Sequence, residues 1–224
     1  IEYEKLEKII SGIFKPEAKK NRMKVLKFGG KSLANGNGLE TVLSIIETKV
    51  KESQNIAVVV SARGNATNEL EDILEKASTN QGYKEQLEAF KTYQTEPLKT
   101  IDFSSEFSKL DTLLEGVSLL EDYSDRIKDE VLAQGELLAT KIVTQLLIER
   151  GINAHATDAR LLIKTDENFG EAQPILTVSE KNIKTHFKKY NGDAVHIVSG
   201  FIASNLKNQT TTLGRNGSNY TASL

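Results

Sequence analysis

Short apolar runs alternate with stretches of helical periodicity along most of this chain. Residues 56–60 are a continuous run of apolar, mostly β-branched residues, which is typical of a buried parallel strand. Similar runs at 25–28 and 194–198 predict two more strands. Apolar residues three and four positions apart predict helices at 39–50, 68–78 and 178–190. Strands that alternate with helices indicate an α/β fold with a mainly parallel sheet.

The long middle segment, residues 83–150, has helical periodicity almost throughout, with breaks expected near Pro97, Gly116 and Ser124. Gly135 lies inside the last of these helices, where a glycine costs about 1 kcal/mol relative to alanine. Close packing or a functional role would explain it. The other expected elements are a helix at 3–14, strands at 153–157 and 161–163, a hairpin at 201–213, and a helix with Ser218 as its N-cap.

The composition is that of an ordinary globular protein, with 38% hydrophobic and 27% charged residues in a chain of 224. A net charge of −2 argues against a broad nucleic-acid surface, which needs a basic excess. The chain has no cysteine, which excludes disulfides and thiolate metal sites and suits a reducing compartment. No apolar run approaches the roughly 20 residues of a membrane span. We therefore expect a cytoplasmic protein with no nucleic-acid or membrane partner.

The two ends of the chain are unusual. The only methionine is Met23, directly before the first expected strand. Residues 1–22 are therefore read as a leader or an extra N-terminal helix, and Met23 as either the natural start or an ordinary strand residue. The last helix has no stop signal, so we expect the chain to be cut there.

Two glycine turns that lie far apart in the sequence each carry a cation. The first strand ends in Lys27-Phe28-Gly29-Gly30, and the loop 210–219 holds Arg215 among glycines. Glycine lets the backbone approach a ligand, and the cation supplies the charge that a phosphate or carboxylate needs. Neither turn has the Walker pattern or the dinucleotide fingerprint. Together they indicate a nucleotide-dependent kinase of another type.

Polar glycine turns follow three of the expected strands, at 29–32, 61–68 and 199–201. Ligands of open α/β sheets bind beyond the carboxyl ends of the strands, so these turns are expected to meet. Phosphoryl transfer depends mainly on positioning and charge neutralisation, which we assign to Lys27 and Arg215. The three histidines have no metal-ligand spacing, and we expect no metal site; they are His155 and His196 on strands and His186 on a helix surface.

The segment 25–33 resembles the N-terminal signature of aspartokinases, and four later segments are similar to that family's other blocks, in order and at fitting spacings. These are residues 61–68, the pair Gly135-Glu136, residues 200–202 and residues 210–220. The resemblance implies the amino-acid kinase fold, a three-layer αβα sandwich with a mainly parallel sheet. It also implies that residues 23–224 are the N-terminal part of that domain. The nucleotide-binding half would then follow Leu224, and this fragment alone would be inactive.

The resemblance also assigns roles to residues at matching positions. Lys27 would hold the ATP phosphates and stabilise the transferred phosphoryl group. The residues expected around the ATP phosphates are Lys27, Phe28, Gly29, Gly30, Gly217 and Ser218. A zwitterion with an extra carboxylate needs an anion and at least one cation for recognition. The residues expected at the substrate are Ser61 and Thr67, Glu136 at its α-ammonium, Arg215 at a carboxylate, and Phe201 as a wall of the pocket.

Two residues depart from the pattern of aspartokinases. Lys31 stands where the family usually has threonine or serine, and it adds charge beside the phosphate turn. Asn219 stands where the family has an aspartate that organises the active-site lysines. Asn219 would border the point of phosphoryl transfer with Lys27 and Arg215, but an amide supplies no charge.

The resemblance implies that ATP, with Mg²⁺, phosphorylates the side-chain carboxylate of L-aspartate to 4-phospho-L-aspartate. This is the first step of lysine, threonine and methionine biosynthesis. The chain looks most like the kinase half of enzymes fused to homoserine dehydrogenase, which implies ACT domains downstream and a homo-oligomer. Two alternatives stay open. One is a kinase-like domain that binds an acidic amino acid without turnover, because of Asn219 and Lys31; the other is a kinase of another amino acid, such as glutamate.

Overall fold

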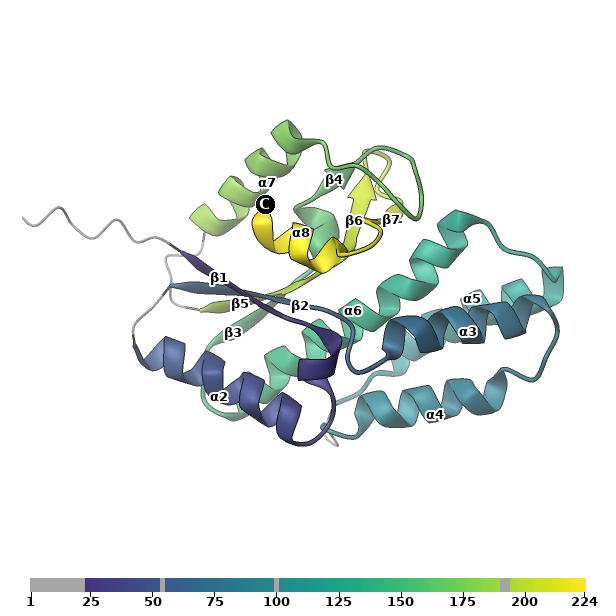
Figure 1. Ribbon diagram of the computed structural model, residues 1–224, viewed down its shortest axis with the longest axis horizontal. Helices are drawn as coiled ribbons and strands as arrows, with labels where there is room; N and C mark the ends of the chain where they lie inside the picture. Colours follow the sequence, from purple (N-terminus) through teal and green to yellow (C-terminus); the bar gives the residue numbers. More distant parts are fainter. Residues whose placement is uncertain (1–22, 53–54, 99–100, 190–193) are drawn as a thin grey trace, which may run out of the picture.

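The computed structural model describes residues 23–52, 55–98, 101–189 and 194–224, and it has an α/β architecture (Figure 1). Four parallel strands form one sheet in the order β1-β2-β5-β3, and three short strands form a second sheet in the order β4-β6-β7. The strands are β1 (Lys24–Phe28), β2 (Ile56–Val60), β3 (Ala154–Thr157), β4 (Lys164–Thr165), β5 (Val195–Ser199), β6 (Ile202–Asn205) and β7 (Thr210–Thr212).

Helices occupy most of the remaining described residues. They are α2 (Asn37–Lys51), α3 (Ala66–Ser78), α4 (Lys84–Thr95), α5 (Ser104–Leu120), α6 (Asp125–Glu149), α7 (Leu176–Lys188) and α8 (Gly217–Ser223), with 3-10 turns η1 (Gly30–Leu33) and η2 (Ala159–Leu161). The helix expected at 3–14, and with it the leader or extra helix at 1–22, lies outside the described residues.

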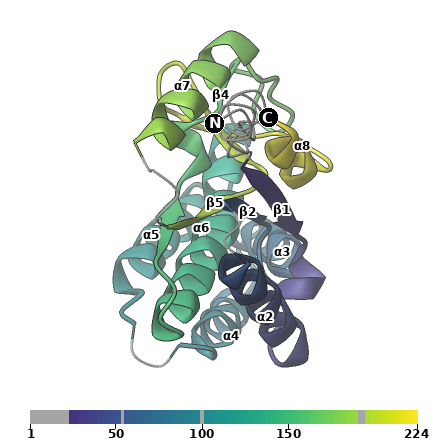
Figure 2. The same ribbon diagram turned by 90° about the vertical axis from the view of Figure 1, so that its left-hand side faces the viewer.

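The parallel sheet is the middle of three layers. Figures 1 and 2 show α2 on one side of it, and α7, α8 and the second sheet on the other. In β2, Ile56, Val58 and Val60 pack with α2 and the C-terminal half of α6, whereas Val59 packs with α7 and the second sheet. Successive side chains of a strand point to opposite faces, so a strand buried on both faces is apolar throughout. The expected αβα sandwich is confirmed.

Helices α3, α4 and α5 pack around the N-terminal half of α6 and form one end of the molecule (Figure 1). Gly135 of α6 allows a close approach there, because a Cβ on it would lie 2.9 Å from Cβ of Ala62. Close packing therefore explains this glycine, and it brings Glu136 against the turn that follows β2. Helix α6 is long and apolar enough to cross a membrane, but 72% of its most apolar stretch of 18 residues is buried inside the protein, as in a core helix.

Two expected helix boundaries were wrong. Gly116 does not interrupt α5, because Leu114 and Val117 beside it are buried in the core and outweigh the low helix propensity of glycine. The last helix starts at Gly217 with Asn216, rather than Ser218, at the N-cap position. Ser218 is instead buried within the first turn of α8.

The strand expected at 161–163 was also wrong. The carboxylate of Asp158 accepts a hydrogen bond of 3.0 Å from N of Arg160, and this local bond starts the 3-10 turn η2. Strand β4 begins only at Lys164 and pairs in parallel with β6. The hairpin expected at 201–213 is confirmed as the antiparallel pair β6 and β7.

The three histidines are neighbours in space, although they are far apart in the sequence. His155 and His196 lie opposite each other on β3 and β5, and the ring centroid of His186 on α7 is 5.2 Å from that of His196. Burial, reinforced by the two other rings, lowers the pKa of His196 to about 4. Burial also lowers the pKa of His186, so these two imidazoles are kept neutral at neutral pH. The expected position of His186 on the helix surface was wrong, because its ring packs against that of His196 on β5.

Candidate active site

The turns after β1, β2 and β5 lie side by side, because the three strands are parallel neighbours. N of Ser61 donates to O of Phe28 at 3.1 Å, and N of Gly200 donates to O of Val60 at 2.8 Å. The carboxyl ends of the strands thus form one continuous floor, where ligands of open α/β sheets bind.

Two glycines after β1 let the first two turns interlock. A Cβ on Gly30 would lie 2.5 Å from O of Ala62 and 2.7 Å from O of Gly64, so no side chain fits there. N of Gly64 donates to O of Gly30 at 2.9 Å. A Cβ on Gly29 would lie 3.4 Å from Nζ of Lys27, so the ammonium of Lys27 lies over the bare backbone of Gly29.

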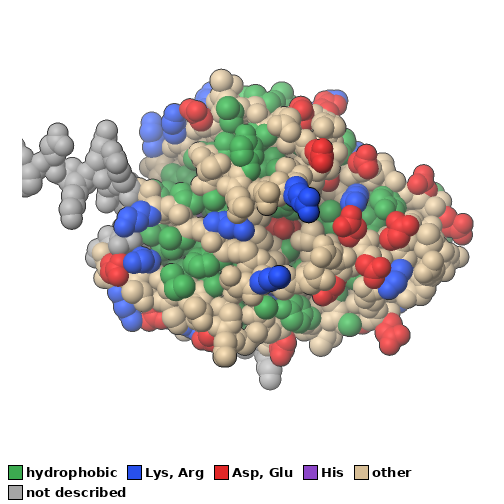
Figure 3. Space-filling model, in the orientation of Figure 1, with side chains coloured by type: hydrophobic (Ala, Val, Ile, Leu, Met, Phe, Trp, Pro, Cys, Tyr) green, Lys and Arg blue, Asp and Glu red, His purple; other side chains and the backbone are tan. Residues whose placement is uncertain are grey.

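A cleft of about 640 Å³ opens above this floor. Figure 3 shows basic side chains along the middle of this face and acidic ones toward the end formed by α3 and α5. Nine of the residues predicted from the sequence line the cleft: Lys27, Ser61, Thr67, Glu136, Phe201, Arg215, Gly217, Ser218 and Asn219. The other three do not line it: Phe28 packs on the apolar core beneath α2, and Gly29 and Gly30 belong to the floor.

Glu136 is the most unusual group in this cleft. Only 2% of its surface is exposed, and its Oε1 accepts one hydrogen bond, of 3.2 Å, from N of Ala62. Its Oε2 has no hydrogen-bond partner among the described residues. Burial raises the pKa of Glu136 to about 8. A buried carboxylate oxygen without a partner is costly, so this geometry favours a ligand that brings a cation or a hydrogen-bond donor.

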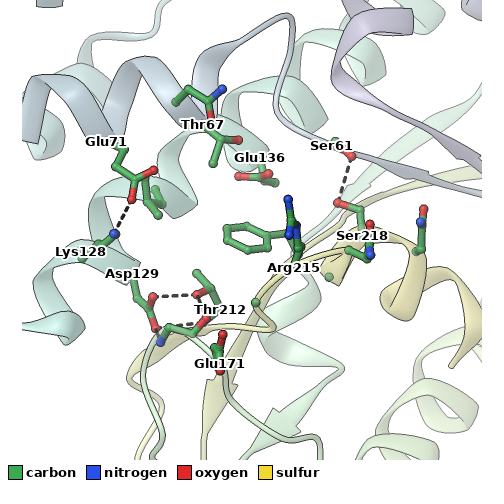
Figure 4. Close-up of a pocket in the computed structure, with 18 of the residues that line it drawn as sticks. Ser61, Thr67, Glu71, Lys128, Asp129, Glu136, Glu171, Thr212, Arg215 and Ser218 are labelled. Carbon is green, nitrogen blue, oxygen red and sulfur yellow. Dashed lines mark hydrogen bonds and ion pairs between the residues drawn. The ribbon is translucent and has the colours of Figure 1, made fainter.

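Arg215 approaches the same space from the C-terminal loop. Figure 4 shows the side chains of Glu136, Thr67 and Arg215 around one space. Arg215 is exposed and lies between Gly214 and Asn216, both of which have left-handed backbones, with φ of 68° and 64°. One left-handed residue stands on each side of Arg215, and its side chain lines the cleft, where the guanidinium could bind a carboxylate.

Hydroxyl groups connect the second turn with α8. Oγ of Ser61 donates to Oγ of Ser218 at 2.9 Å, across 157 positions of sequence. A Cβ on Gly200 would lie 2.6 Å from Oγ of Ser218, so this glycine makes room for the pair. A ligand bound in the cleft could therefore break the hydrogen bond between these two hydroxyls and form hydrogen bonds with them instead.

Phe201 lines the cleft with a strained backbone. Its φ is 67°, a region that a bulky residue rarely adopts. Its N donates to Oγ1 of Thr221 at 3.2 Å, and its O accepts from N of Leu213 at 2.9 Å. Such strain persists only where surrounding contacts hold the backbone in place, and strained residues of this kind cluster at functional sites.

The sequence analysis missed two buried charged residues beside the cleft. Asp129 of α6 lines it, and it is 1% exposed. Asp129 and Glu136 are spaced so that they share one face of the helix, which periodicity could have revealed. Arg63, in the middle of the 61–68 turn, has no exposed surface and gave no sequence signal beyond a polar turn.

Arg63 attaches the turn to its surroundings. Its guanidinium donates to O of Leu33 at 3.2 Å, to O of Gln94 at 3.1 Å and to Oδ1 of Asn35. It also lies 5.3 Å from the centre of the Tyr93 ring. The turn that carries Ser61 and Thr67 is thereby fixed to helix α4 and to the loop before α2.

Aspartokinases are among the known proteins that this chain resembles in sequence. A bifunctional aspartokinase/homoserine dehydrogenase of Buchnera aphidicola is 31% identical over 217 residues, which are 90% of this chain and 26% of that protein. Lysine-sensitive aspartokinase 3 of Escherichia coli is 30% identical over 206 residues, covering 89% of this chain and 45% of that protein. The chain therefore spans less than half the length of either relative.

Solved structures agree with the sequence relatives. Escherichia coli aspartokinase III in complex with aspartate and ADP superimposes with a TM-score of 0.79 at 29% identity, covering 89% of this chain and 45% of that one. The same enzyme with lysine and aspartate gives a TM-score of 0.77 at 27% identity, covering 90% and 45%. The sequence model of the amino acid kinase family matches residues 22–224. This chain therefore belongs to the amino acid kinase family.

Proposed function

We propose that this chain carries the amino-acid site of an aspartate kinase, which transfers the γ-phosphoryl group of ATP to the side-chain carboxylate of L-aspartate. The observation that carries the proposal is the unpartnered Oε2 of buried Glu136, in a cleft that also holds the cations Lys27 and Arg215. A ligand with one ammonium and two carboxylates complements these charges. The similarity to aspartokinases supports the same substrate.

Each end of the substrate has a complementary group in the cleft. Glu136 would accept hydrogen bonds from the α-ammonium, and the bound cation would stabilise its ionised form. Arg215 would bind a carboxylate with its planar fork of donors. Ser61 and Thr67 would donate hydroxyl hydrogen bonds to the remaining oxygens.

The reaction joins one oxygen of the side-chain carboxylate to the γ-phosphorus and breaks the bond from that phosphorus to the bridging oxygen of ADP. The carboxylate is already ionised, so no base is needed. Lys27 would stabilise the negative charge on the transferred group, while Gly29 and Gly30 let the backbone come close to it. The roles of Phe28, Gly217 and Ser218 at the phosphates are part of this proposal.

The described residues contain no group of three His, Cys, Asp or Glu side chains that could hold a metal ion. Magnesium usually binds through one or two carboxylates together with substrate phosphates and water. The described residues therefore fit a metal ion that enters with the nucleotide and takes most of its ligands from the phosphates and water. When bound, Mg²⁺ would neutralise charge on the phosphates.

A second function, binding of an acidic amino acid without turnover, is favoured by Asn219. Its amide lines the cleft where aspartokinases carry an acid, and it supplies no charge to order the lysines around the phosphoryl group. Lys31 is exposed, lies outside the residues that line the cleft, and adds charge to the turn after β1.

The test is aspartate-dependent release of ADP by the complete natural protein, with Lys27→Ala as the control. Activity that disappears in the control supports the kinase. Binding of aspartate without ADP release supports the second function, and Asn219→Asp should then restore turnover. Preference for glutamate over aspartate in a competition assay would change the substrate and retain the kinase.

The wider setting belongs to the same proposal. We place the enzyme in the cytoplasm, at the first step of lysine, threonine and methionine biosynthesis, as a homo-oligomer. Fusion to ACT and homoserine dehydrogenase domains is the arrangement that the bifunctional relatives suggest. The 224-residue chain by itself should release no ADP, because it spans less than half the length of the aspartokinases that it resembles.

A further inference from the structure

We propose that Asp129 is a positioning residue: it fixes the loop that carries Arg215 to the helix that carries Glu136, and so sets the separation of the two groups that hold the amino acid. This inference rests on the proposed function for the identity of the ligand. The anchoring itself is a property of the fold and can be measured without a ligand.

The carboxylate of Asp129 holds two segments at once. Its Oδ2 accepts hydrogen bonds of 3.0 Å from N of Gly170 and 3.0 Å from N of Thr212, and its Oδ1 accepts one of 2.7 Å from Oγ1 of Thr212 (Figure 4). Burial raises the pKa of Asp129, and these three donors oppose that rise. A buried carboxylate is stable in a protein when its oxygens are satisfied in this way.

Both anchored segments lead directly to the Arg215 loop. Thr212 is the last residue of β7, and the left-handed turn at Gly214 follows it before Arg215. A Cβ on Gly214 would lie 3.4 Å from O of Gly170, so the second anchored segment packs against that turn. N of Ala172 also donates to O of Thr212 at 2.9 Å, which joins the two segments.

Helix α6 connects this anchor with Glu136. A shift of seven positions is close to two helical turns, so Asp129 and Glu136 lie on the same face, roughly 10 Å apart along the axis. The part of α6 between these two residues is largely buried, and a packed helix is rigid on this scale. The ammonium acceptor and the base of the loop that carries the carboxylate clamp are therefore linked through one helix and three hydrogen bonds, which limits how far that loop can move relative to Glu136.

Two substitutions at Asp129 separate anchoring from charge. Asp129→Ala leaves N of Gly170 and N of Thr212 without an acceptor. Asp129→Asn can keep every contact, because the amide oxygen can accept both N–H bonds and the amide nitrogen can donate to the hydroxyl of Thr212. Asp125→Ala is the matched control, since it removes the same charge one turn away on an exposed part of α6.

The experiment measures aspartate affinity of the complete protein by NMR titration, which reaches millimolar dissociation constants. Asp129→Ala should weaken aspartate at least about tenfold, while Asp129→Asn and Asp125→Ala stay within about threefold of the natural protein. In an Arg215→Ala background, Asp129→Ala should add less than about twofold, because it acts through Arg215. The proposal is overturned if the loss of aspartate affinity in the double variant equals the product of the two single losses. It is also overturned if Asp129→Ala and Asp125→Ala lose the same affinity.

Two further measurements cover the remaining outcomes. If Asp129→Ala does not fold, Thr212→Val replaces it, because this change removes only the hydroxyl donor. Thr212→Val should lower aspartate affinity severalfold in the natural protein but not in the Arg215→Ala background; equal effects in both overturn the proposal.

If the natural protein binds no aspartate, the proposed function fails, and hydrogen exchange decides whether the anchor exists. Faster exchange at Gly170, Thr212 and Arg215 in Asp129→Ala than in Asp125→Ala supports the anchor, and equal exchange refutes it.

Discussion

The raised pKa of Glu136 makes aspartate binding depend on pH. Without ligand, this buried carboxyl is neutral below its pKa of about 8. The α-ammonium of aspartate would favour the ionised form, so binding in the neutral range must first remove a proton from Glu136. The affinity should therefore rise with pH and become constant once Glu136 is ionised in the free protein.

The size of the effect follows from that pKa. At about pH 6 roughly one free molecule in a hundred has Glu136 ionised, and at about pH 8 roughly half do, so aspartate should bind about 50-fold more tightly at the higher pH. At about pH 7, binding should release about 0.9 proton per site. Free aspartate keeps its charges unchanged across this range, so the protein is the source of the proton.

Calorimetry in buffers of different ionisation enthalpy measures the released proton directly. Glu136→Gln should abolish both the proton release and the pH dependence, and should bind aspartate poorly. Glu71→Gln, on α3 at the rim of the same cleft, is the matched control and should retain both. An affinity that is constant between about pH 6 and pH 8, or proton release that persists in Glu136→Gln, would refute the reasoning.

In the ligand-free protein, protonation of Glu136 should make the free energy of unfolding depend on pH. The pKa rises from 4.5 for an ordinary glutamate to about 8 in the folded state, so the folded state binds the proton more tightly than the unfolded one. Stability from this group is therefore fully present below about pH 4.5 and is lost as the pH rises toward about 8, by about 1.4 kcal/mol per unit. The difference in unfolding free energy between Glu136→Gln and the natural protein should grow over that window.

Three further predictions concern other residues. Lys27→Ala should lower turnover at least about 100-fold, measured by ADP release, and should lower aspartate affinity far less, because its charge acts mainly on the phosphoryl group. Arg63→Met should cost about 2–4 kcal/mol in urea unfolding, because it leaves buried carbonyl oxygens without donors; a neutral result would contradict the role of these bonds. Gly135→Ala should destabilise by about 1–3 kcal/mol despite its better helix propensity, because its Cβ would meet Ala62; a more stable variant would contradict this.

The parallel sheet could be predicted because its signals are local. The apolar run at 56–60 and the turns after three strands are properties of short segments, and the rule for open α/β sheets then brings those turns together. Lys27, Ser61, Thr67 and Phe201 line one cleft for this reason. The other five predicted residues that line it lie on α6 or after β7, where this rule does not apply: Glu136, Arg215, Gly217, Ser218 and Asn219. Their individual roles stay predictions, because position in a cleft does not specify which ligand atom each side chain meets.

Features that depend on distant partners could not be predicted. Strand β4 has only two residues, and it becomes a strand through its pairing with β6. Arg63 reads as a solvated residue of a polar turn, because its acceptors come from Leu33, Asn35 and Gln94, which are remote in sequence. Buried polar groups are defined by such tertiary acceptors, which a single segment does not reveal.

The burial of the two binding groups indicates which part of the ligand the cleft recognises most strictly. Glu136 is buried and without a second partner, whereas Arg215 is exposed to water. Water can solvate an exposed cation when its ligand is absent, but it cannot easily reach the unpartnered oxygen of a buried carboxyl group. Loss of the ligand's ammonium should therefore cost more than a change in the length of its side chain.

Two aspartate analogues separate these effects. Succinate has both carboxylates and no ammonium, and glutamate has the ammonium and one extra methylene group. A methylene in a binding pocket is worth about 1–3 kcal/mol, whereas an unpaired buried polar group discriminates more strongly. Inhibition constants against aspartate should thus rank glutamate before succinate. The reverse order would mean that the exposed cations dominate recognition, and that the buried Glu136 serves the fold rather than the ligand.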